Sequence, residues 1–123
     1  MSYAERHTVS VTTIADGSAT AYSEVITGRI HSMTYTKTDF TDGVDFTITL
    51  EATGQTVWTQ SNVNATATVA PRIATTDTAG VASLYAAAGE PVEDYLVAAE
   101  DRVKIVIAAG GDTKTGTFTI IVA

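Results

Sequence analysis

Residues 44–51 read V-D-F-T-I-T-L-E, and this stretch decides the fold. Every second residue is apolar and faces one side of an extended chain: Val44, Phe46, Ile48 and Leu50. A period of two is that of a β-strand with one face in a core and the other in water. The chain also holds 23 threonines, and this β-branched residue favours strands. The pattern therefore predicts half-buried strands packed around one core.

Further runs with strand character lie on both sides of this stretch, at spacings of about ten residues with glycine-containing turns between them. They are residues 7–14, 19–25, 29–37, 55–60, 92–98, 103–108 and 114–122. The large apolar residues of 29–37 are out of register, which predicts a β-bulge near Ser32. Residues 62–71 suit either an edge strand or an extended loop, which Pro71 ends because proline cannot donate to a ladder.

One segment has the period of a helix. Its apolar residues are spaced i, i+3, i+4, i+7: Val81, Leu84, Tyr85 and Ala88. Asp77 or Thr78 can cap its start, and Gly89 and Pro91 follow its end. The spacing makes this segment the one helical candidate, so the fold should contain at most one short helix, near residues 79–88, which would need to pack against the sheets.

These elements together predict an all-β fold, an antiparallel, jelly-roll-like β-sandwich of seven or eight strands, with a closed barrel as the alternative. At 123 residues, the chain fits one domain over residues 1–123. Residues 1–7 are polar and are expected to form a contact arm that becomes ordered on docking.

Charge and composition exclude several classes of function. The net charge is −7, and the seven basic residues are scattered, so we expect no nucleic-acid partner. The absence of cysteine removes disulfides, zinc–thiolate sites and thiol catalysis. The first residues lack a signal-peptide pattern and no run is long enough to span a membrane, so we expect a soluble protein made in the cytoplasm.

Possible chemical sites have plain structural interpretations. Asp39, Asp42 and Asp45 surround a glycine and weakly resemble a calcium loop, but a hairpin turn explains them better. His7 and His31 lie on separate predicted strands. The acidic residues of 90–101 fit a solvated face better than a catalytic carboxylate pair. These are Glu90, Glu93, Asp94, Glu100 and Asp101. We therefore predict no enzyme activity, no cofactor and no metal.

Five stretches carry a resemblance to a known family. They are Y-S-E-V-I-T-G-R-I (22–30), Y-T-K-T-D-F-T-D-G-V-D-F (35–46), E-A-T-G-Q-T-V-W-T (51–59), D-R-V-K-I-V-I-A-A-G-G (101–111) and K-T-G-T-F (114–118). In these stretches the chain resembles small virion proteins of tailed bacteriophages, whose genes sit near that of the major capsid protein. The similarity is one of strands and turns and includes no catalytic signature.

The resemblance implies a structural role on the virion, as a decoration or cement protein on the capsid surface. Its expected partners are the major capsid protein and further copies of itself, for example a trimer around a local threefold axis. Because aromatic and arginine side chains dominate interfaces, the expected contact residues are Tyr3, Arg6, Trp58 and Arg72. The alternatives are a head–tail connector or tail component, and a carbohydrate-binding module in which Trp58, Tyr35 and Tyr85 stack on sugars.

Overall fold

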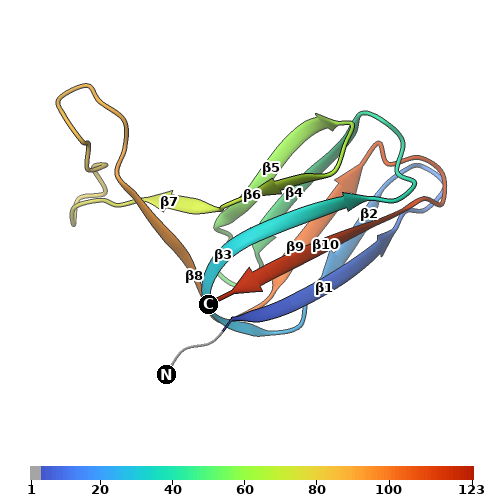
Figure 1. Ribbon diagram of the computed structural model, residues 1–123, viewed down its shortest axis with the longest axis horizontal. Coiled ribbons are helices and arrows are strands. Elements are labelled where there is room, and N and C mark those ends of the chain that lie inside the picture. The colour runs from blue at the N-terminus through green and yellow to red at the C-terminus, as the bar shows by residue number, and fades with distance from the viewer. Residues whose placement is uncertain (1–3) are drawn as a thin grey trace.

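The computed structural model describes residues 4–123, which form ten strands in antiparallel sheets (Figure 1). The first sheet contains, in order, β1 (Glu5–Thr12), β10 (Thr115–Val122), β3 (Ile26–Lys37), β8 (Glu93–Asp101) and β7 (Arg72–Ala74), and β6 (Ala67–Val69) also pairs with β3. The second sheet contains β2 (Ala19–Tyr22), β9 (Val103–Ala108), β4 (Val44–Leu50) and β5 (Thr56–Val63). Their inner faces enclose one core, so the predicted all-β sandwich is confirmed.

The strand pairing is that of a long hairpin rolled up on itself. Strand β1 pairs with β10, β2 with β9, β3 with β8, and β4 with β5. Nested antiparallel pairs of this kind, divided between two sheets, are the topology of an eight-stranded jelly roll. The two remaining strands, β6 and β7, have three residues each and lie between β5 and β8 in the chain. The structure thus has more strands than predicted because of two short insertions into the expected topology.

The core follows from the alternation read in the sequence. All four apolar residues of β4 are buried, and Phe46 lies at the centre of an aromatic cluster. Its ring centroid is 4.7 Å from that of Trp58 and 5.3 Å from those of Tyr35 and Phe118. Edge-on and tilted contacts at such distances are favourable aromatic geometries. Phe40, from the turn before β4, also enters the core and stacks on Tyr35.

The predicted irregularities of the sheet are present. Ile121 faces Ser32 while Val122 faces Ile30, so His31 is the extra residue of a bulge in β3. The bulge expected near Ser32 is therefore confirmed. Within the ambiguous segment 62–71, residues 62–63 end β5 and residues 67–69 form the short strand β6, which pairs with three residues of β3.

The candidate helix near residues 79–88 does not form, and these residues form turns and isolated bridges instead. The Asp77 carboxylate accepts hydrogen bonds from the backbone N–H groups of Ala79 (2.8 Å) and Val81 (3.0 Å). Gly80 has a φ of 83°, which is outside the helical region. A helix this short needs a surface to pack on, and this segment projects away from the sandwich (Figure 1). The local turn chemistry therefore prevails over the helical period.

The N-terminal arm expected over residues 1–7 is only partly within the described range. Glu5, Arg6 and His7 belong to β1 and pair with the end of β10. These three residues are part of the sheet, and residues 1–3 lie outside the described residues.

Candidate functional site

The main candidate site is a projection formed by residues 72–95, which we call the arm (Figure 1). It consists of β7, the loop that follows, and the start of β8. Strand β8 changes partner along its length: residues up to Tyr95 pair with β7, and residues from Leu96 pair with β3. The arm is thus a direct extension of a strand that is anchored in the sandwich.

The base of the arm is held by cationic and aromatic side chains. The guanidinium carbon of Arg72 lies 4.2 Å from the centroid of the Tyr95 ring, and that of Arg29 lies 5.0 Å from it. Arg72 also donates hydrogen bonds to the carbonyl oxygens of Pro71 (2.7 Å) and His31 (3.2 Å). Each cation–π contact contributes about 0.5–1 kcal/mol at an exposed position. These contacts set the direction in which the arm leaves the sheet.

Backbone hydrogen bonds connect three segments within the arm. Thr75 donates to the Val92 carbonyl (2.8 Å), Val92 donates to that of Ser83 (2.8 Å), and Ser83 donates to that of Thr75 (2.9 Å). Two turns beyond this junction close with bridges between Thr76 and Ala82 and between Leu84 and Pro91. The arm therefore has defined backbone structure up to its tip.

The same segment buries almost none of its apolar side chains. Every residue from 76 to 91 is exposed. Tyr85 is 75% exposed, Val81 62% and Leu84 44%. The three residues lie within five positions of the chain, and exposed apolar surface with polar residues around it marks interaction sites. The arm thus offers an apolar surface that nothing in the described chain covers.

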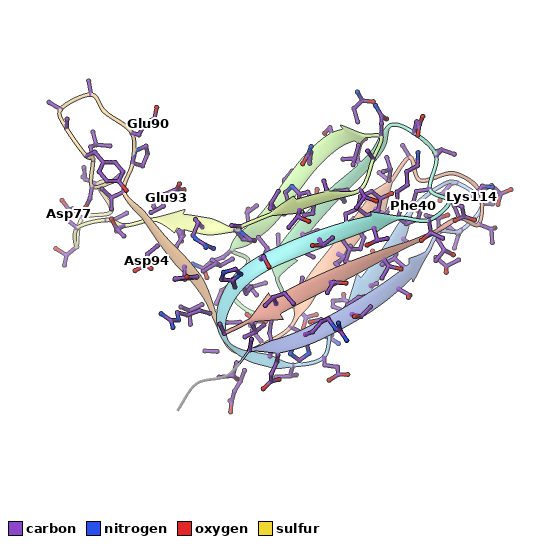
Figure 2. All side chains as sticks on the ribbon, viewed as in Figure 1. Phe40, Asp77, Glu90, Glu93, Asp94 and Lys114 are labelled. Atoms are coloured by element: carbon purple, nitrogen blue, oxygen red, sulfur yellow. The ribbon has the colours of Figure 1, made fainter. Side chains whose placement is uncertain are left out.

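The arm is also acidic. Four carboxylates lie along it, and Arg72 at its base is its one basic residue. Figure 2 shows the four acidic side chains along the arm: Asp77, Glu90, Glu93 and Asp94. The backbone N–H of Tyr85 donates to the Glu90 carbonyl (3.1 Å), so an acidic residue lies beside the apolar ones. The surface combines apolar and negatively charged groups.

The residues expected from the sequence to contact a partner are not brought together. Arg6 is exposed on β1, at one edge of the first sheet, whereas Trp58 is on β5, an edge strand of the second. Trp58 is only 7% exposed, and its indole N–H donates to the Gln60 side chain (2.9 Å). Arg72 is engaged at the base of the arm, and Tyr3 lies outside the described residues. The three described members of the set, Arg6, Trp58 and Arg72, thus lie on different elements.

The aspartates around Gly43 have separate structural partners. Asp39 accepts a hydrogen bond from the backbone of Thr115, and Asp42 pairs with Lys37. The carboxylate of Asp45 accepts from the Asn62 N–H at 2.8 Å. Within residues 4–123, no group of three or more histidine or acidic side chains is placed to hold a metal ion. The turn interpretation accounts for these three carboxylates.

The two histidines and the buried Asp101 have separate surroundings. His7 lies 3.4 Å from the Glu5 carboxylate, while His31 is beside Tyr95, with 6.4 Å between the ring centroids. Asp101 is buried, and one of its oxygens accepts from the N–H groups of Ala52 (2.9 Å) and Arg102 (2.8 Å). The described part of the chain has no pocket for a small ligand. It also has no helix with the length and apolar character to cross a membrane.

Sequence reasoning missed the arm because it assigned the apolar residues to a helix packed on the sheets. The sequence nevertheless contains a pattern from which the arm could have been predicted. Between Arg72 and Arg102 the chain has no basic residue, and its acidic residues flank the apolar run of 81–88. Segregation of this kind is typical of an exposed, polar-rimmed surface.

Comparisons of the chain with protein-family models, with curated proteins and with solved structures gave no match.

Proposed function

We propose that the protein is a structural component of a bacteriophage virion, a decoration protein that binds the major capsid protein lattice and stabilises the head. The sequence stretches that resemble small virion proteins motivate this proposal. The observation that carries it is the arm, an ordered and exposed projection with apolar side chains on a β-sandwich of two sheets. A rigid body with one projecting attachment element suits a protein that is fixed to a larger assembly.

The physical properties of the chain fit this role. A net charge of −7 on particle-bound copies would make the particles repel each other and stay dispersed. A capsid presents the same surface many times, so a modest contact made by each copy can add up to firm attachment when the copies associate. We therefore propose that the protein also contacts further copies of itself on the lattice.

The experiment that tests this function uses capsids that lack the protein. Purified protein is mixed with heads assembled from the major capsid protein of the same phage, and the particles are imaged by electron microscopy. Density at regular lattice positions is expected, with copies on the order of hundreds per head, since each lattice point repeats the site. Absence of binding at every stage of head maturation would refute the proposal.

Copy number also separates this function from the alternatives. A head–tail connector or tail component would occupy one vertex in about six or twelve copies, as the ring symmetry of such parts requires. The carbohydrate-binding alternative placed Trp58 on a sugar, but this ring is buried against Phe46. Binding to a glycan array that is lost in Trp58→Ala while the sandwich stays folded would favour that alternative.

A further inference from the structure

We infer that residues 76–91 of the arm are the docking element, and that they bind a protein groove with an apolar floor and a rim of lysine and arginine. This inference rests on the proposed function, because it places that groove on the capsid lattice. The contact surface on this chain is then the arm, and the surface that receives it is apolar with a basic rim.

The described conformation of the arm has few sources of order within the chain. Fixing a backbone costs conformational entropy at every residue, and an isolated two-stranded hairpin in water is only marginally stable. The arm has backbone bonds between Thr75, Ser83 and Val92 but no core of its own, since every residue of 76–91 is exposed. Covering its apolar side chains would supply the missing stabilisation. Docking is therefore the state in which this conformation is best supported.

Tyr85 is the residue of the arm best suited to anchor the contact. Tyrosine in a desolvated pocket is among the most frequent dominant residues of protein interfaces. Tyr85 is 75% exposed and lies in the turn that the bridge between Leu84 and Pro91 closes, and Val81 precedes it by four residues. The backbone of the turn holds Tyr85 through its bond to Glu90. This arrangement presents an aromatic anchor on a short, defined support.

The negative charge of the arm indicates the charge of the surface that it binds. The arm has four carboxylates, and its single guanidinium is occupied on Tyr95. Complementary potential across an interface requires positive groups on the other side. The bridge between Leu84 and Pro91 places Glu90 next to the apolar residues, and Glu93 follows closely in the chain. A groove that accepts Tyr85 and Leu84 would therefore have basic side chains at its rim.

Charge also argues against a second copy of this chain as the protein that supplies the groove. The whole chain is acidic, so two copies repel each other at long range. Four of its seven basic side chains are already engaged within the chain: Arg29 and Arg72 on Tyr95, Lys37 with Asp42, and Arg102 with Glu51. The basic rim is therefore better supplied by a different protein.

The test measures binding of variants to capsids that lack this protein, by co-sedimentation at two salt concentrations. The first variant is Leu84→Ser/Tyr85→Ser, and the second is Glu90→Lys/Glu93→Lys. The matched control is Ile14→Ser/Val25→Ser, which replaces apolar residues on the sandwich that are 63% and 64% exposed. We expect affinity to fall at least about tenfold in the first variant and to remain unchanged in the control. The second variant should bind more weakly, with a smaller loss on addition of salt.

The outcomes distinguish the inference from the function on which it rests. If the unaltered protein does not bind capsids, the proposed function is wrong. If the unaltered protein binds capsids and both arm variants bind as tightly as it does, the inference is wrong and the function stands. Hydrogen exchange gives a second measurement that needs no variant. Slower exchange of the amides of 77–90 on capsid binding supports the inference, and protection confined to the sandwich overturns it. If the arm variants change only the self-association of the protein, the arm binds a second copy of this chain. That result would also overturn the inference.

Discussion

Arg72 and Tyr95 are register partners across β7 and β8, and the Arg72 guanidinium also lies over the Tyr95 ring, 4.2 Å from its centroid. Tyr95 is the last residue of β8 before the strand joins β3 at Leu96. The pair therefore stands at the point where the arm meets the sandwich. Because both residues belong to the arm while Arg29 comes from β3, the cluster connects the two parts of the molecule.

Replacing Arg72 by alanine should loosen the arm without unfolding the sandwich. The change removes the contact with Tyr95 and the hydrogen bonds to Pro71 and His31, a loss of about 1–2 kcal/mol. Hydrogen exchange should become faster in residues 73–95 and stay unchanged in β9. The control Arg6→Ala, on an exposed strand position, should leave both segments unchanged. Hydrogen exchange that becomes equally faster in β9 would contradict the assignment of Arg72 to the base of the arm.

Gly116→Ala should destabilise the protein by overpacking. A Cβ at this position would lie 2.4 Å from an edge carbon of the Phe40 ring, and forcing extra volume into a packed core costs about 1–3 kcal/mol. Urea denaturation measures the change in the free energy of unfolding. The double variant Gly116→Ala/Phe40→Leu should be less destabilised than the sum of the two single changes, because the smaller side chain leaves room. Simple additivity would show that the two positions do not compete for space.

Asp101→Ala should cost more stability than the removal of any exposed carboxylate. Asp101 is 4% exposed and accepts hydrogen bonds from the backbone of Ala52 and Arg102. Its loss leaves these donors without their partner, at a cost of about 1–3 kcal/mol. The control Asp94→Ala removes an exposed acidic residue and should change the unfolding free energy by less than about 0.5 kcal/mol. Similar values for the two variants would rule out a structural role for Asp101.

The ion pair between Glu51 and Arg102 should make stability depend on pH. Hydrogen bonds from the Arg102 side chain lower the pKa of the Glu51 carboxyl below its usual value of 4.5. A carboxyl with a depressed pKa in the folded state stabilises it above the unfolded pKa, and this contribution is lost as pH falls through the folded value. The difference in Tm between the natural protein and Glu51→Gln should therefore be larger at about pH 7 than at about pH 3.

The same comparison of Tm is repeated at high salt and with a control variant. Both side chains are at the surface, so the difference in Tm should shrink at about 1 M salt, where charges are strongly screened. The control Glu93→Gln, which replaces an exposed acid on the arm, should change the Tm at about pH 7 by less than Glu51→Gln does. A difference for Glu51→Gln that is constant from pH 7 to pH 3 would contradict the role given to this pair.

The sequence by itself determined the sandwich and most of its core. Alternation at residues 44–51 specified which side chains of β4 are buried, because a strand turns successive residues to opposite faces. The break in register around Met33 located the bulge in β3. Both features depend on residues that are close together in the chain, so a local sequence pattern is enough to predict them.

The arm was decided only by the tertiary structure. The spacing of Val81, Leu84 and Tyr85 is that of a helix, but a short helix forms only where its apolar face can be buried. Here β8 leaves the sheet before Leu96, so no surface lies opposite the segment, and the turns at Asp77 and Gly80 prevail. In the same way, burial of Trp58 against Phe46 and engagement of Arg72 by Tyr95 depend on residues distant in the chain. Which apolar side chains remain exposed is a property of the packed fold, because burial requires a partner surface that a linear pattern does not contain.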